Sequence, residues 1–144
     1  MNMQEAIQSQ LLAALKMLKQ AVVKCPPAVW NASRDKDKFW YKAAHALYWS
    51  HRFLQATTRD FVPQKGHRNP ESGNPVSKPA VLGQLAFIEQ QVAGRGLAFR
   101  QDQLEQAIAG IRHIQQHTGE LYERLGVRAN ARLSWTEEVH RKRR

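Results

Sequence analysis

The chain has 144 residues, 42% of them hydrophobic and 24% charged, and we expect residues 1–144 to form one globular domain. No apolar run approaches the roughly 20 residues that cross a bilayer, and residues 1–10 lack the features of a secretory signal. The single cysteine excludes an internal disulfide. We therefore expect a cytoplasmic protein that does not contact a membrane. The net charge of +10, which includes a basic C-terminal tail at residues 141–144, favours anionic partners, either nucleic acid or small molecules, although no nucleic-acid motif accompanies it.

Residues 3–24 are predicted to form an amphipathic helix. Apolar residues recur there at spacings of three or four, as one helical face requires: Ile7, Leu11, Leu15, Leu18 and Val22. Pro26 and Pro27 end the helix, because proline disfavours a helical conformation in the residue before it. A loop or short turn over 26–35 contains Trp30, and Asp35 is a candidate N-cap for the next helix.

The second predicted helix covers residues 36–57 and is rich in aromatic side chains. Five of the twelve aromatic residues of the chain are here, namely Phe39, Trp40, Tyr41, Tyr48 and Trp49. A helix that is apolar on most sides should lie centrally in the fold. Three of these aromatics are three or four residues from His45, so we expect them to surround this imidazole with apolar walls.

Residues 58–76 hold three prolines and two glycines and are predicted to form a loop. A connection of this length is typical of a crossover between helices that point the same way. Ser77 is a candidate N-cap for a third helix, which should continue to about Val92 before Gly94 and Gly96 interrupt it. The predicted fold is therefore an all-α four-helix bundle with a long crossover between helices two and three.

The fourth predicted helix begins near Gln101, and Gly126 is a candidate stop just after its end. Its apolar side should carry five residues, namely Leu104, Ile108, Ile111, Leu121 and Leu125. In the tail over 127–144 we expect one anchor, Trp135.

His113 and His117 are four residues apart in the fourth predicted helix, so they share one helical face. Two imidazoles so placed can bind one divalent metal ion together, and His45 is the candidate third ligand. Three histidine ligands with an open position are typical of a catalytic rather than a structural zinc site. A buried imidazole that only makes a structural hydrogen bond is the alternative interpretation for His45.

Glu120 is the acidic residue nearest to this pair in sequence. It is a candidate general base, a hydrogen-bond partner for a ligand histidine or a fourth ligand; the alternative is a surface pair with Arg124. His51 is rotated about 240° from His45 on the helix and should not share its metal.

Three further residues receive no role in this site. His67 and His140 are expected to be solvated. Cys25, without an activating neighbour in the sequence, is expected to be a small core residue.

Segments 39–48 and 111–121 resemble the second helix and the last helix of DinB-like proteins, and Trp135 resembles a tryptophan that follows that last helix. The resemblance implies a bundle of up-down-down-up order, often dimeric, in which His45, His113 and His117 hold a divalent ion, zinc or nickel. It also implies thiol S-transferase or hydrolase chemistry. Glu120 departs from the family, which commonly has glutamine there, and the chain is short for the family.

We therefore expect a metal-dependent enzyme that activates a thiol or water, with a small-molecule thiol or electrophilic substrate as its partner. Two alternatives from other classes remain. One is a non-enzymatic basic helical module that binds nucleic acid through phosphates, and the other is a dimeric scaffold stabilised by its metal site.

Overall fold

The computed structural model describes residues 1–54, 67–94 and 101–136, and all regular structure in these ranges is helical. The elements are α1 (Met3–Lys24), α2 (Pro27–Trp30), α3 (Phe39–Phe53), the 3-10 helix η1 (Pro70–Ser72), α4 (Lys78–Gly94) and α5 (Gln101–Ala129). The prediction of an all-α fold is confirmed. None of the helices in the described ranges has both the length and the apolar character needed to cross a membrane.

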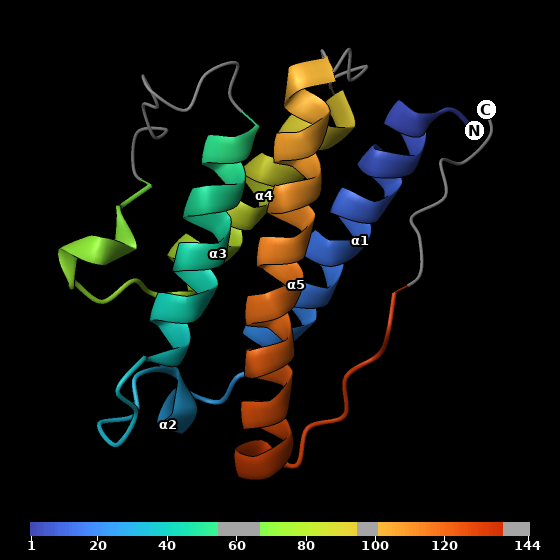
Figure 1. Ribbon diagram of the computed structural model, residues 1–144. Helices are drawn as coiled ribbons and strands as arrows, with labels where there is room; N and C mark the ends of the chain where they lie inside the picture. The colour runs from blue at the N-terminus through green and yellow to red at the C-terminus, as the bar shows by residue number, and fades with distance from the viewer. Residues whose placement is uncertain (55–66, 95–100, 137–144) are drawn as a thin grey trace.

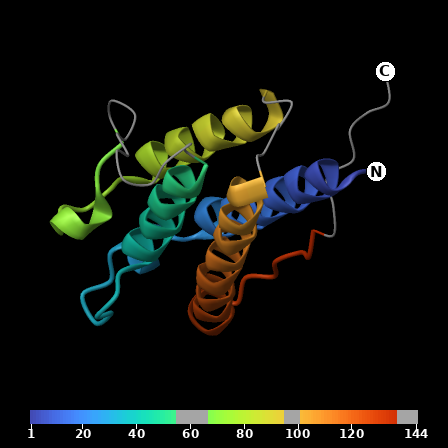
Figure 2. The same cartoon turned by 45° about the horizontal axis from the view of Figure 1, so that its top comes forward.

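The four long helices pack around one core (Figures 1 and 2). Helix α5 packs against both α1 and α3, and α4 packs against the same two helices. The predicted apolar face of α1 is confirmed, since all five of its residues are at most 7% exposed. The side-by-side packing of α3 and α5 is the feature that brings distant histidines together.

Local hydrogen bonds explain where α1 and α4 begin. Asn2 and Glu5 form a reciprocal capping box at the start of α1, with both side chain–backbone distances at 2.9 Å. The hydroxyl of Ser77 accepts from the backbone N–H of Ala80 at 3.3 Å, so the predicted cap of α4 is confirmed. Helix α4 extends to Gly94, two residues beyond the expected end.

The start of α3 differs from the prediction. Lys38 is the N-cap residue, without a side-chain cap, so α3 begins at Phe39 rather than at residue 36. Asp35, the predicted cap, instead accepts two hydrogen bonds from the guanidinium of Arg128. A charge-assisted pair with an arginine outcompetes a single capping bond to a backbone N–H. Residues 58–66 of the predicted loop, and the expected helix end at 57, lie outside the described residues, while the rest of that loop, 67–76, contains the 3-10 helix η1.

The end of α5 also differs from the prediction. The helix passes through Gly126 and ends at Ala129, and Asn130 follows with φ of 47°, a left-handed conformation that asparagine tolerates. Ile108 was expected on the apolar side but is 47% exposed, whereas Ala107 and Ile114 are buried.

Trp135 is not an anchor, because its side chain is 70% exposed. The segment after α5 is held against α1 by other contacts. Gln20 exchanges two hydrogen bonds with the backbone of Ser134, and Lys24 donates to the carbonyl of Arg132. Hydrogen bonds to the backbone, together with the packing of Ala131 and Leu133 against the core, therefore hold this segment in place of the tryptophan.

Candidate metal centre

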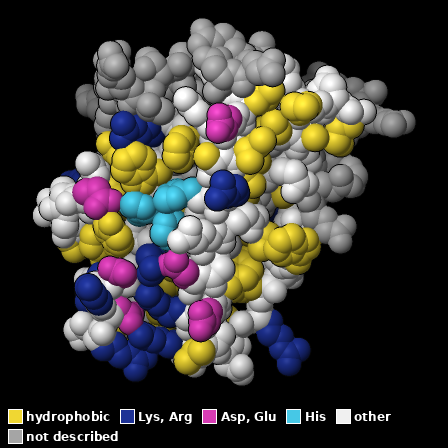
Figure 3. All heavy atoms as spheres, viewed as in Figure 1, with side chains coloured by type: hydrophobic (Ala, Val, Ile, Leu, Met, Phe, Trp, Pro, Cys, Tyr) yellow, Lys and Arg dark blue, Asp and Glu magenta, His cyan; other side chains and the backbone are white. Residues whose placement is uncertain are grey.

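The contact between α3 and α5 positions three imidazoles from distant parts of the chain. His45 lies in the middle of α3, and the alanines around it are buried, which lets the backbones approach closely. His113 and His117 lie one turn apart on α5. The space-filling view shows the histidine side chains gathered on one face of the molecule (Figure 3).

The three imidazoles converge. One ring nitrogen from each of His45, His113 and His117 lies within 4.8 Å of the others. The ring centroids are 5.1 Å apart for His45 and His113, 5.0 Å for His45 and His117, and 4.6 Å for His113 and His117. The structure thus brings together the three residues that the sequence selected as ligands, each of them partly buried.

His113 carries a polar atom without a partner. Its Nε2 is buried and makes no hydrogen bond within the described residues. Burial, together with the neighbouring imidazoles of His117 and His45, lowers the pKa of His113 to about 4. The ring is therefore neutral at pH 7, which is the form that binds a metal ion. Burial also lowers the pKa of His117, although Glu120 opposes this shift.

A carboxylate orients His45. Glu71 Oε1 lies 2.7 Å from His45 Nδ1, and the hydroxyl of Tyr41 donates to both oxygens of the same carboxylate at 3.0 and 2.9 Å. Burial alone would raise the pKa of Glu71, but the hydrogen bonds from His45 and Tyr41 outweigh it and lower the pKa. An ionised carboxylate requires a proton on Nδ1, so in the neutral ring Nε2 is free to bind a metal.

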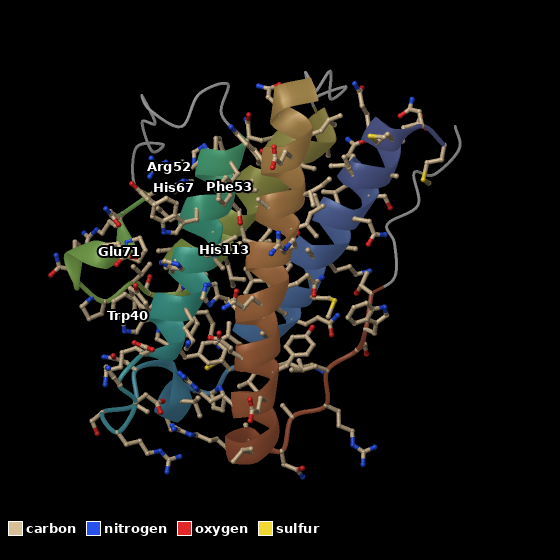
Figure 4. The ribbon with its side chains drawn as sticks, viewed as in Figure 1. Trp40, Arg52, Phe53, His67, Glu71 and His113 are labelled. Atoms are coloured by element: carbon tan, nitrogen blue, oxygen red, sulfur yellow. The ribbon has the colours of Figure 1, made fainter. Side chains whose placement is uncertain are left out.

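Glu71 was missed by the sequence reasoning. It belongs to η1, on the opposite side of α3 from α5 and level with His113 (Figure 4). The side chain of Asn69 accepts from the backbone N–H of Glu71 at 3.0 Å, and Gly73 ends the turn at φ of 78°, a conformation that favours glycine. The Asn-Pro-Glu sequence signals this turn, but nothing local links it to His45.

Glu120 lies beside the histidines, as expected, but pairs differently. Its Oε2 is 3.4 Å from Nδ1 of His117 and forms an ion pair with Lys42 of α3. Burial would raise the pKa of Glu120, but the hydrogen bond and charge of Lys42 outweigh it and lower the pKa. The alternative pairing with Arg124 is wrong, because Arg124 donates to the carbonyl of Asp37 instead.

The two other histidines among the described residues do not join this cluster. His51 packs against Phe87 and His67, with ring centroids 5.4 and 6.2 Å away. The expectation that His67 is solvated is wrong: Nδ1 of His67 is buried, and burial lowers the pKa of the ring. The ring of Phe87 on α4 packs edge-on against the ring of His67. This contact with a distant helix could not be predicted from the position of His67 in a loop-like sequence. His140 lies outside the described residues.

Cys25 is confirmed as a core residue. It is 1% exposed, and burial raises the pKa of its thiol to about 11. A thiol with this pKa stays protonated at neutral pH and is a poor nucleophile.

The donor set suits a late divalent metal ion. It consists of three imidazoles, one with an unpartnered nitrogen and two with Nδ1 beside a carboxylate. Histidines that bind zinc commonly have such a carboxylate next to the ring nitrogen that does not bind the metal. Comparisons with models of protein families, with curated proteins and with solved structures find no match to this chain. The function must therefore be argued from the site itself.

Proposed function

We propose that this protein is a metal-dependent enzyme of the DinB-like type, in which His45, His113 and His117 hold one zinc or nickel ion. The observation that carries the proposal is the convergence of one ring nitrogen from each histidine within 4.8 Å, and His113 also has a buried Nε2 without a partner among the described residues. The resemblance of two helices to DinB-like proteins is the second support. The up-down-down-up helix order, a homodimer and a cytoplasmic location belong to the same proposal.

The proposed chemistry is thiol transfer or hydrolysis. A divalent ion with an open position lowers the pKa of water or of a thiol, so that a nucleophile forms near neutral pH. The residues of the chain have complementary roles. Glu71 holds the ring of His45 in place, and Glu120, ionised beside Lys42, is the proposed general base that accepts a proton from the nucleophile or from a substrate.

Metal analysis tests the ligand assignment. Protein purified without chelators and without a metal-affinity column should contain one equivalent of zinc or nickel, measured by inductively coupled plasma mass spectrometry. The His113→Ala variant should lose it, since two ligands hold a metal poorly. The control is His67→Ala, a histidine that is partly buried but outside the cluster. A wild-type protein without a stoichiometric ion, or an unchanged ion content in His113→Ala, would contradict the proposal.

Activity tests the chemistry separately from the metal. The metal-loaded protein is screened with low-molecular-weight thiols plus electrophiles and with ester and amide substrates. Glu120→Gln should keep the ion and lose turnover if Glu120 is the general base. A protein that loses thermal stability on chelation but shows no turnover in either screen would instead be the metal-stabilised scaffold.

A further inference from the structure

An open hollow adjoins the histidine cluster on the α5 side. Its volume is about 680 Å³, and it is lined by Phe53, Ala109, Arg112, His113, Gln115 and Gln116. His113 therefore belongs both to the cluster and to the wall of the hollow. A molecule that occupies the hollow lies next to the position where the three imidazoles converge.

The hollow contains a cation that the fold does not use. Arg112 is exposed and makes no ion pair or hydrogen bond within the ranges that the structure describes. The arginines further along α5 behave differently, because Arg124 and Arg128 both contact the carboxylate of Asp35. The acidic residue nearest the cluster on α5, Glu120, is already paired with Lys42. The guanidinium of Arg112 is therefore available to a ligand.

Phe53 gives the hollow an apolar, aromatic wall. The ring of Phe53 packs on Gly110, where an added Cβ would lie 3.6 Å from it, and meets the ring of His113 edge-on with centroids 6.4 Å apart. Figure 4 shows Phe53 and His113 next to each other between α3 and α5. Gln116, one turn after Arg112, adds an exposed amide at the edge. The hollow thus combines a cation, an amide and an aromatic wall.

We propose that this hollow binds the carboxylate end of the substrate, with Arg112 as the anion-binding residue and Phe53 as the apolar contact. A guanidinium donates two parallel hydrogen bonds to a carboxylate, which gives orientation as well as affinity. The reacting end of such a molecule would face His45, His113 and His117. The inference rests on the proposed function and adds a substrate class to it, namely small carboxylates that carry a thiol or an apolar segment.

The test uses matched thiols and cobalt(II)-substituted protein. The probes are 3-mercaptopropionate and 3-mercaptopropanol, with the longer pair 6-mercaptohexanoate and 6-mercaptohexanol, so that each carboxylate has a neutral analogue of equal length. Binding is followed by the absorption of cobalt(II). We expect at least one carboxylate to bind about threefold to tenfold more tightly than its alcohol, as expected for one exposed charge-assisted contact.

The variants assign this preference to one residue. Arg112→Gln should bind cobalt normally but lose the preference for the carboxylate, and Arg112→Lys should keep only part of it, because lysine keeps the charge without the planar fork. Arg132→Gln, which removes an exposed arginine from the segment that follows α5, should keep the full preference.

The outcomes separate this inference from the proposed function. Equal affinities within both pairs of thiols, or a preference that survives in Arg112→Gln, would overturn the role of Arg112 while leaving the metal site intact. Failure of the wild-type protein to bind cobalt at all would overturn the proposed function and this inference together. Circular dichroism of Arg112→Gln confirms that the exposed substitution leaves the helices in place.

Discussion

Glu71 decides which nitrogen of His45 is left to bind a metal ion. Its carboxylate occupies Nδ1 at 2.7 Å and is itself held by the hydroxyl of Tyr41. Burial, and then the hydrogen bond and charge of Glu71, raise the pKa of Tyr41 to about 12, so the phenol remains a donor at any physiological pH. This chain of contacts fixes the tautomer and the orientation of His45 before any ligand binds.

We predict that Glu71→Ala lowers the affinity of the protein for zinc by about tenfold or more, the usual effect of removing a carboxylate behind a ligand histidine. The zinc affinity of Glu71→Gln should lie between those of the wild-type protein and Glu71→Ala, because the amide keeps an acceptor oxygen but loses the charge. Competition with a chromophoric chelator measures the affinity.

The control for this prediction is Glu123→Gln, which removes an exposed carboxylate from α5. It should bind zinc like the wild-type protein. Equal affinities for Glu71→Ala and Glu123→Gln would show that the contact between Glu71 and His45 has no part in metal binding.

Helix α5 continues past Gly126 because Arg128, in its last turn, is paired with Asp35 outside the helix. Arg128 makes a bidentate pair with Asp35, a buried carboxylate in the segment before α3. Burial would raise the pKa of Asp35, but Arg128 and Arg124 outweigh it and lower the pKa, so the carboxylate is ionised at neutral pH. The ion pair therefore fixes the C-terminal end of α5 against the start of α3.

Gly126 provides a test of this arrangement. Its φ is not positive, and an added Cβ would meet no atom within 4 Å. Gly126→Ala should therefore raise the free energy of unfolding by about 0.5–1 kcal/mol, the difference between glycine and alanine inside a helix. Urea denaturation of the two proteins measures it.

Gly73→Ala is the matched control for this substitution. Gly73 also has open space around its Cβ position, but its φ is 78°, so alanine there should destabilise the protein by about 1 kcal/mol. Destabilisation by Gly126→Ala would mean that α5 ends at Gly126 with a left-handed residue, as its sequence alone predicts.

Across the whole molecule, the long helices could be predicted from the sequence. The contacts between these helices could be predicted only in part. Apolar spacing predicts α1, and the residue type of Ser77 predicts the cap of α4, because both features depend on residues within a few positions. The grouping of His45 with His113 and His117 could be predicted because their spacing and the family resemblance indicated the same three residues. The role of Glu71 could not be predicted, since its partner His45 is 26 residues away in the sequence.

The same reason accounts for the errors. Asp35 was expected to cap a helix but is paired with Arg128, which is 93 residues away. Trp135 was expected to anchor the tail, yet it is 70% exposed, and the backbone of Ser134 beside it is hydrogen-bonded to the side chain of Gln20 in α1. Local propensity does not contain these long-range contacts, so only the assembled structure reveals them.

The histidine cluster makes the stability of the whole molecule depend on pH. The pKa of His113 is about 4 in the folded protein and 6.5 without burial. Between these values the unfolded chain binds more protons than the folded one, so the free energy of unfolding falls as the pH decreases through this window. We predict that the metal-free protein is less stable in urea at pH 5 than at pH 7, and that His113→Gln loses less stability between these two pH values.

Part of the decrease should remain in His113→Gln, because burial also lowers the pKa values of His117 and His67. The carboxylates of Asp35, Glu71 and Glu120 contribute little, because stability gained from a lowered carboxylate pKa is lost mainly as the pH falls below the ordinary pKa values of 3.8 and 4.5. Zinc should enlarge the difference between pH 7 and pH 5, because the ion binds only neutral imidazoles and protons displace it. An equal loss of stability in the wild-type protein and in His113→Gln would show that His113 is not desolvated by the contact between α3 and α5.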